Sequence, residues 1–217
     1  MKRMNEKIYA VAVDGPPGAG KSTLARAAAE RPGILYVDTG AISRTNGVSV
    51  YRHHIDPKDA AAGAAVLPEI TIRLRYDDVG LTRMSLNGED VTKEIRLPAM
   101  SMYASDVSAI PAVRDYLMEL QRSLAREHSV IMDGRDIGTV VLPDATVKIF
   151  LTATPEARAT RRWKEYQAKG IDTPYEEVLA DVKQRDYQDT HRAAAPLKQA
   201  EDAVLLDTSE LDFEQSL

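Results

Sequence analysis

A glycine-rich stretch decides the fold, and it reads Gly15-Pro16-Pro17-Gly18-Ala19-Gly20-Lys21-Ser22-Thr23. It follows an apolar run at residues 8–13 and opens an alanine-rich helical segment. Glycines let backbone N–H groups turn inward around phosphate oxygens, and the helix N-terminus adds partial positive charge. The stretch therefore predicts a nucleoside triphosphate loop, in which Lys21 reaches the β- and γ-phosphates and Ser22 ligates Mg²⁺.

The composition narrows the class of protein. The 217 residues suffice for one large domain, and a formal charge of −5 argues against a nucleic-acid-binding surface. The sequence contains no cysteine, which excludes disulfides and thiol chemistry. The apolar run after Met1-Lys2-Arg3 is too short for a secretory signal, and no run has membrane length. We expect a cytoplasmic monomer that acts on small molecules, with no nucleic acid or membrane partner.

Short apolar runs alternate with helical stretches along the chain. Such runs are typical of strands buried on both faces, and helices between them indicate a parallel sheet with ligands at the carboxyl ends of its strands. The runs lie at residues 8–13, 34–37, 130–132, 147–151 and 204–206. The predicted fold is an α/β, P-loop NTPase-type parallel sheet flanked by helices.

One region breaks this alternation. Residues 70–76 alternate apolar and polar side chains, as a half-exposed strand does, and Asn87-Gly88 is a typical tight hairpin turn. We expect a small antiparallel insert at about residues 66–97, within a core made of residues 1–65 and 98–217. An extension of the main sheet is the alternative.

Three helices have clear sequence signals. Thr154 precedes a proline at the first helical position, and Gly170 closes that helix. Thr173-Pro174-Tyr175-Glu176 has the spacing of a capping box that would start the next helix. Residues 111–127 carry an apolar stripe at helical spacing, which is ordinary core packing.

Arginines on the first of these helices suggest phosphate chemistry. Transfer of a γ-phosphoryl group requires several fixed cations around the group in flight, and guanidinium groups suit this role. Arg158, Arg161 and Arg162 stand at i, i+3 and i+4, so they share one helix face. This face could close over a triphosphate, and a solvated surface is the alternative.

The next helix repeats the pattern with mixed charges. Arg185, Asp189 and Arg192 stand at i, i+4 and i+7, again on one face. Intrahelical ion pairing is one interpretation, worth about 0.3 to 0.5 kcal/mol for each pair. A wall of the substrate site is the other.

Two predicted strands end in charged residues. Residues 130–136 form an apolar strand that runs into Asp133, Arg135 and Asp136, a charge density that favours function at a strand's carboxyl end. Residues 34–40 repeat the arrangement, and Asp38 or Thr39 could cap a helix that points Arg44 toward the same edge of the sheet. Capping alone would explain Asp38 and Thr39, but it would not explain Arg44.

From residue 8 to about residue 206 the chain closely resembles the bacterial cytidylate kinases. The resemblance rests on motifs that are together far more specific than the phosphate loop alone. They are residues 14–23, Asp38-Thr39-Gly40-Ala41-Ile42, Leu86-Asn87-Gly88-Glu89-Asp90-Val91, residues 133–141, residues 147–151 and the Arg192 to Leu197 segment. The insert of about thirty residues is also a mark of this family.

The resemblance implies ATP-dependent phosphorylation of CMP and dCMP with Mg²⁺, in a core, an insert that binds the monophosphate and a helical lid at about residues 154–175. By matching position, Lys21, Arg135 and the lid residues Arg158, Arg161 and Arg162 resemble the catalytic cations, and residues 15–23 hold ATP. The implied acceptor site comprises Asp38, Thr39, Arg44, Ser105, Arg114, Arg135, Asp136, Arg185, Asp189 and Arg192. Arg44 and Arg135 would grip the acceptor phosphate, Arg185 and Asp189 would contact the ribose, and Ser105, Arg114, Asp136 and Arg192 would read cytosine.

The chain departs from the family pattern after Gly40. Ser43 stands where a tyrosine is usual, and Thr45-Asn46-Gly47-Val48-Ser49 replaces an alanine- and leucine-rich helix. Because Asn, Gly and Ser are poor helix formers, we expect a frayed helix and weaker CMP binding there. Two alternatives stay open: a P-loop kinase for UMP, AMP or a small metabolite, and a nucleotide-binding regulatory module without turnover.

Overall fold

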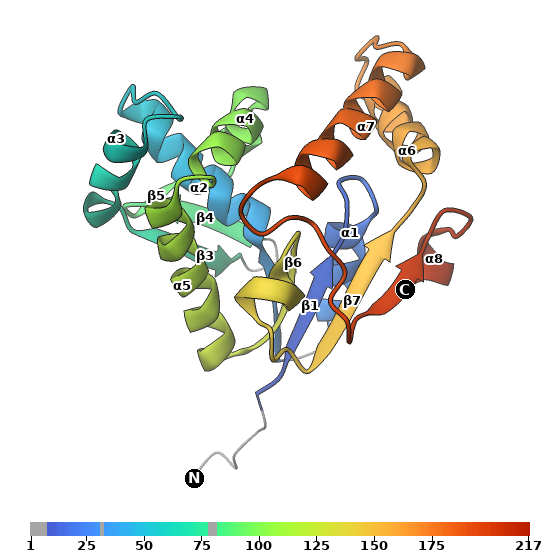
Figure 1. Ribbon diagram of the computed structural model, residues 1–217, viewed down its shortest axis with the longest axis horizontal. Helices are drawn as coiled ribbons and strands as arrows, with labels where there is room; N and C mark the ends of the chain where they lie inside the picture. The colour runs from blue at the N-terminus through green and yellow to red at the C-terminus, as the bar shows by residue number, and fades with distance from the viewer. Residues whose placement is uncertain (1–7, 31–32, 78–81) are drawn as a thin grey trace. The chain divides into compact units, whose positions relative to one another are not determined.

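The computed structural model describes residues 8–30, 33–77 and 82–217, and it separates into two compact units (Figure 1). Of the described residues, those between 38 and 123 form the second unit, and the others form the first. The start of the chain, where we weighed a signal sequence, lies outside the described residues. Within them, no helix is both long enough and apolar enough to cross a bilayer.

The first unit is built on a five-stranded sheet in the order β2-β6-β1-β7-β8. Strand β1 pairs in parallel with both β6 and β7, and β7 pairs in parallel with β8. The apolar runs do form the strands, namely β1 (Ala10–Asp14), β2 (Ile34–Asp38), β6 (Ser129–Gly134), β7 (Val147–Thr152) and β8 (Val204–Asp207). Asp14 is in register with Gly134, so the phosphate loop after β1 and the charged residues after β6 leave the sheet at the same edge.

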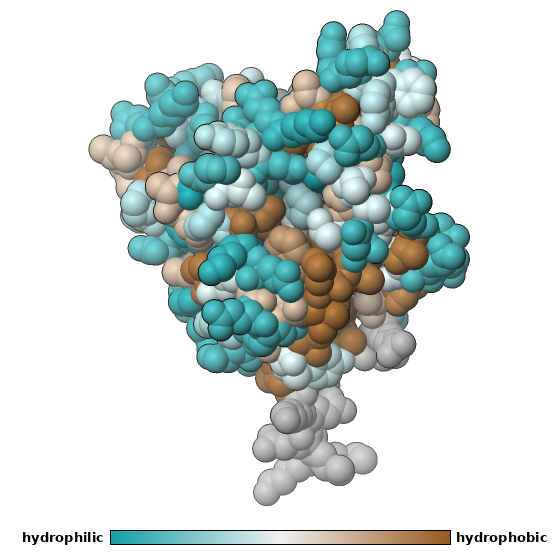
Figure 2. All heavy atoms as spheres, turned by 45° about the vertical axis from the view of Figure 1, so that its right-hand side comes forward, coloured by the Kyte–Doolittle hydropathy of each residue, from teal (hydrophilic) through white to brown (hydrophobic). Residues whose placement is uncertain are grey.

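Helices cover this sheet and extend beyond it. Figure 2 shows many hydrophilic residues on the visible surface and a patch of hydrophobic residues near the lower centre of the view. Helix α1 (Lys21–Ala29) contributes Ala25 to a core that also contains Val13, Ile131 and Leu151. Helices α6 (Pro155–Ala168) and α7 (Tyr175–His191) lie side by side around a separate small core of Ala159, Val178 and Val182 (Figure 1). The unit is completed by a π-helical turn, η3 (Ile137–Val141), and a short terminal helix, α8 (Phe213–Ser216).

The second unit contains the expected antiparallel sheet in the order β3-β4-β5. Asn87 and Gly88 form its tight turn with φ values of 51° and 87°, as the two-residue hairpin requires. The strands are β3 (Ile72–Tyr76), β4 (Thr82–Leu86) and β5 (Glu89–Asp90). The helices are α2 (Thr39–Arg52), α3 (Ala60–Ala65), α4 (Pro98–Val107) and α5 (Pro111–Glu127), with 3₁₀ turns at η1 (Leu67–Glu69) and η2 (Glu94–Arg96).

The frayed helix predicted after Gly40 is wrong. Helix α2 runs unbroken from Thr39 to Arg52, and Thr45 donates its hydroxyl to the Ala41 carbonyl at 2.9 Å. Gly47 lies so close to α4 that a Cβ there would stand 3.1 Å from the Ala104 nitrogen. Packing on α4 therefore outweighs weak intrinsic propensity, as tertiary contacts commonly do.

One of the two predicted helix starts is also wrong. Thr154 caps α6 as expected, accepting from the Ala157 N–H at 3.2 Å, and Gly170 follows the helix with φ 70°. Helix α7, however, begins at Tyr175 with Pro174 at its N-cap position and no side-chain cap bond. The capping box fails because the chain enters the helix one residue later than the Thr173 spacing requires.

Candidate functional site

The loop between β1 and α1 has the backbone conformation of an anion cradle. Gly15, Gly18 and Gly20 all have positive φ, and Gly20 is the N-cap of α1. At Gly15, a Cβ would stand 1.9 Å from the Leu151 carbonyl oxygen, so only glycine fits beside strand β7. The N–H groups of the loop and the positive end of the nine-residue helix α1 therefore face the same anion-binding position.

Lys21 lies at the base of this loop and is buried. Its ammonium donates to the Pro16 carbonyl at 2.8 Å, which holds the side chain across the loop. Burial, reinforced by the positive charge of Arg135, lowers the pKa of Lys21 to about 7. An anion bound by the loop would stabilise the charged form of this side chain.

Asp133 is a site residue that our sequence-based assignment left out. Its carboxylate accepts from the Ser22 hydroxyl at 2.7 Å and from the Tyr36 hydroxyl at 2.9 Å, and the residue is buried. Its place at the end of an apolar strand was visible in the sequence, but the partner Ser22 is 111 positions away. Ser22 and Asp133 together offer the hydroxyl and carboxylate oxygens with which P-loop enzymes hold Mg²⁺, so these residues fit that ion.

Asp14 shapes the turn that follows β6. One carboxylate oxygen accepts from the Ile137 N–H at 2.8 Å and the other from the Gly138 N–H at 2.7 Å. Burial raises the pKa of Asp14, although these two hydrogen bonds oppose the shift. Asp14 therefore fixes the start of η3, directly after the residues Arg135 and Asp136.

Two ion pairs join the end of β6 to α7 and the loop after it. The Arg135 guanidinium donates to Asp189 at 2.7 Å, and Arg192 lies 3.5 Å from Asp136. Arg192 also donates to the carbonyl of Ala195, a residue held at φ 46°. The structure thus brings four of the predicted acceptor residues together beside the phosphate loop.

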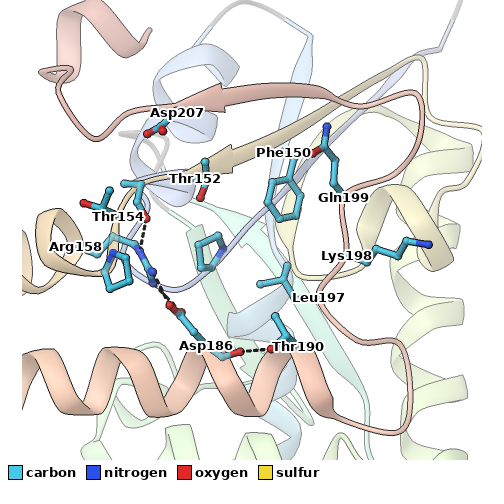
Figure 3. Close-up of a pocket in the computed structure, with 13 residues that line it drawn as sticks. Phe150, Thr152, Thr154, Arg158, Asp186, Thr190, Leu197, Lys198, Gln199 and Asp207 are labelled. Atoms are coloured by element: carbon cyan, nitrogen blue, oxygen red, sulfur yellow. Dashed lines mark hydrogen bonds and ion pairs between the residues drawn. The ribbon is translucent and has the colours of Figure 1, made fainter.

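The remaining predicted cations of the first unit all have protein partners. Arg161 donates to the Thr208 carbonyl and hydroxyl, and Arg185 pairs with Asp181 at 3.4 Å within α7. Arg162 contacts the Tyr166 ring and hydroxyl and pairs with Asp181 at 3.3 Å. Arg158 is almost wholly buried in the network shown in Figure 3.

A pocket of about 440 Å³ lies beside the Arg158 network (Figure 3). Pro16 of the phosphate loop and Thr152 of β7 line one part of it, and Asp186 and Thr190 of α7 line another. The loop that follows α7 contributes Leu197, Lys198 and Gln199. The P-loop and α7 therefore share the lining of a single pocket.

The other predicted acceptor residues belong to the second unit. Asp38 caps α2 by accepting from the Ala41 N–H at 2.7 Å, and it lies 3.4 Å from the Arg44 guanidinium. Thr39 is the first residue of α2 and is buried. Ser105 is exposed on α4, and Arg114 is half-buried on α5.

A parallel sheet with a glycine-rich phosphate loop after its first strand, a lysine at the loop base and an acid at the end of the adjacent strand defines a P-loop kinase. The family model described as "Cytidylate kinase" matches residues 11–217. The chain belongs to the cytidylate kinase family and is a phosphotransferase.

Curated relatives match nearly the whole chain. The cytidylate kinase of Caldicellulosiruptor bescii is 46% identical over 217 residues, covering 100% of this chain and 93% of the relative. That of Geobacter sulfurreducens is 47% identical over 207 residues, covering 95% and 88%. The similarity therefore includes both units.

Proposed function

We propose that this enzyme transfers the γ-phosphoryl group of ATP to CMP and dCMP. The observation that carries the proposal is the pair of ion pairs, Arg135 with Asp189 and Arg192 with Asp136, at the same sheet edge as Lys21. A phosphate loop accounts for ATP alone. Two arginines and two carboxylates beside it supply the charges and the hydrogen-bonding groups that a second nucleotide requires.

Asp136 and Arg192 suit a cytosine base. A carboxylate accepts from the exocyclic amine of cytosine, and a guanidinium donates to its ring carbonyl and ring nitrogen. Uracil carries a carbonyl in place of that amine and would leave Asp136 facing another acceptor, a mismatch that costs several powers of ten in kcat/KM. Ser105 and Arg114, which belong to the second unit, are the other proposed contacts to the base. The same unit contributes three further proposed contacts to the acceptor nucleotide, namely Asp38, Thr39 and Arg44.

Phosphoryl transfer here needs positioning more than a strong base. The acceptor phosphate is already ionised near neutral pH, so its oxygen can attack the γ-phosphorus in line without losing a proton to the enzyme. The bond from the γ-phosphorus to the β–γ bridging oxygen breaks, and ADP leaves with that electron pair. Lys21 and Arg135 neutralise the charge of the group in flight, and Arg161 and Arg162 approach it from α6. Arg185 and Asp189 orient the ribose. Ser22 and Asp133 would hold Mg²⁺, which would supply positive charge against the triphosphate.

Loss of Lys21 tests the catalytic part of this proposal. Lys21→Met should abolish formation of CDP from ATP and CMP, while the far-ultraviolet circular dichroism spectrum stays that of the wild type. Lys183→Met, which removes an exposed lysine on α7, is the matched control and should retain activity. Near-normal CDP formation by the Lys21 variant would overturn the assigned role.

A further inference from the structure

One guanidinium joins three parts of the first unit. Arg158, on α6, donates through Nε to the Ala153 carbonyl at 2.8 Å and through Nη1 to the Pro17 carbonyl of the phosphate loop at 3.1 Å. The same guanidinium grips the Asp186 carboxylate of α7 with two bonds, at 2.8 and 2.5 Å. Figure 3 shows the pair at one end of the pocket.

The Arg158 side chain is buried, so its charge depends on the partners that the fold provides. Arg158 is 2% exposed, and Gly18 of the phosphate loop packs against its stem, since a Cβ there would stand 3.4 Å from the Arg158 Cβ. A bidentate arginine–carboxylate pair fixes geometry as well as charge, and removing one partner leaves a buried charge uncompensated. The position of Asp186 on α7 is therefore tied to the conformation of the phosphate loop.

The same helix face carries an acceptor residue. Asp189 stands three residues after Asp186, so both carboxylates lie on one face of α7, and Asp189 pairs with Arg135 at the end of β6. Helix α7 is thus fixed at two adjacent points, one at the triphosphate loop and one at the strand end that carries Arg135. The Arg158–Asp186 pair also fixes the position of Arg185, which directly precedes Asp186 in α7.

We infer that Arg158 and Asp186 form a positioning brace, which holds the triphosphate loop and the acceptor face of α7 in register, and that Arg158 does not act on the phosphoryl group itself. The inference rests on the proposed function, and it gives Arg158 a role different from that of Arg161 and Arg162. In this arrangement the guanidinium already makes four hydrogen bonds to protein acceptors. Asp186 becomes a functional residue although nothing places it against a nucleotide.

Steady-state kinetics of Asp186→Asn test the brace. The variant should raise the KM for ATP and the KM for CMP together, each by about tenfold, because both sites lose their alignment. A mere loss of folded enzyme would lower kcat and leave both KM values unchanged. Asp186→Asn with both KM values within twofold of the wild type would overturn the inference.

Pairing with Arg158→Met sharpens the test. A brace predicts that Asp186→Asn, Arg158→Met and the double variant lose similar amounts of kcat/KM, because all three break the same contact. A phosphate-contacting Arg158 predicts a large loss for Arg158→Met and almost none for Asp186→Asn, which would contradict the brace. If the kcat/KM losses of the two single variants multiply in the double variant, the brace is contradicted as well.

A second ion pair provides the control. Lys183 of α7 and Glu156 of α6 pair at 3.1 Å between the same two helices, but both side chains are more than half exposed. Glu156→Gln should leave kcat and both KM values unchanged, since exposed pairs contribute little. An effect equal to that of Asp186→Asn would show that any α6–α7 contact suffices, which overturns the specific role of the brace.

Two further measurements cover an Asp186→Asn variant that does not fold and a wild-type enzyme that has no activity. If Asp186→Asn does not fold, Arg158→Lys replaces it as the test. This variant retains the charge but cannot span Asp186 and the Pro17 carbonyl, so it should raise the KM for ATP. An unchanged KM for ATP would overturn the brace.

If the wild-type enzyme phosphorylates no nucleotide, the proposed function fails. The brace is then tested by binding of a fluorescent ATP analogue, which Asp186→Asn should weaken about tenfold and Glu156→Gln should not.

Discussion

The Arg135 guanidinium is bound to the Asp189 carboxylate, with Nε 2.7 Å from Oδ2, although the two residues are 54 positions apart. This pair joins the end of β6 to α7. The carboxylate holds the Arg135 side chain in one orientation, so that under the proposed function this cation would bind the acceptor phosphate at little cost in side-chain entropy.

Replacing the Asp189 carboxylate should raise the KM for the acceptor nucleotide more than the KM for ATP. Asp189→Asn removes the charge that holds Arg135 and the proposed contact with the ribose. The KM for CMP should rise about tenfold or more, with a smaller change in the KM for ATP. Initial rates at saturating ATP and varied CMP, and the converse, measure both constants. Equal changes in the two would show that Asp189 does not belong to the acceptor site.

Lys21 should take up a proton when ATP binds. Its pKa is lowered to about 7 by burial and by Arg135, so at about pH 8 much of the free enzyme has a neutral lysine. A triphosphate stabilises the ammonium form and raises its pKa, so binding takes up close to one proton. Calorimetry at about pH 8 in buffers of different ionisation enthalpy measures this uptake.

Arginine at this position provides the control for proton uptake. A guanidinium stays charged at all working pH values, so Lys21→Arg should bind ATP with heat that does not depend on the buffer. Heat that is independent of the buffer for the wild-type enzyme would contradict a neutral Lys21 in the free state.

The sequence predicts more of the fold than of the candidate site. The strands and the hairpin follow from local signals, because apolar runs and Asn87-Gly88 dictate backbone conformation on their own. The continuity of α2 could not be predicted, since its packing on α4 is a contact between segments far apart in the chain. The same holds for Asp133, which the sequence places at a strand end without revealing that Ser22 is its partner.

Arginine spacing places residues on helix faces but does not identify their partners. Helical spacing left open whether Arg185, Asp189 and Arg192 pair within α7. In the structure Arg185 pairs within α7, with Asp181, while Asp189 pairs with Arg135 and Arg192 with Asp136. Periodicity places residues on a face, and only the tertiary fold shows what that face meets.

Asp14 should contribute strongly to stability. Asp14→Ala leaves the buried N–H groups of Ile137 and Gly138 without acceptors, so the free energy of unfolding should fall by about 2 to 5 kcal/mol in urea denaturation. Asp14→Asn keeps one acceptor oxygen and should lose less. A change below about 0.5 kcal/mol in the alanine variant would contradict the role of this carboxylate.

The raised pKa of Asp14 gives this contribution a pH dependence. Between the ordinary value of 3.8 and the raised value, the folded protein binds more protons at this group than the unfolded chain does. The unfolding free energy therefore falls as pH rises through that window. Asp14→Asn should remove this part of the slope in urea denaturation at several pH values, and an unchanged slope would contradict the assignment.

Ser49 should be a destabilising residue of α2. It is fully buried and its hydroxyl has no hydrogen-bond partner, and the Asn46 side-chain amide beside it in the same helix has none either. Ser49→Ala should raise the free energy of unfolding by about 1 kcal/mol or more, because a buried unsatisfied group costs about 1 to 3 kcal/mol. Thr45→Ala is the control with the opposite sign, since it breaks the bond to Ala41. A loss of stability in the Ser49 variant would show that its hydroxyl stabilises α2, contrary to this prediction.

The most direct test of the proposed function is a coupled assay of ADP release with ATP and each of CMP, dCMP, UMP, AMP and GMP as acceptor. Asp136 and Arg192 predict that CMP and dCMP are phosphorylated with a kcat/KM higher than that for UMP by several powers of ten. A preference for UMP or a purine nucleotide, or ATP binding without turnover on any acceptor, would contradict the account.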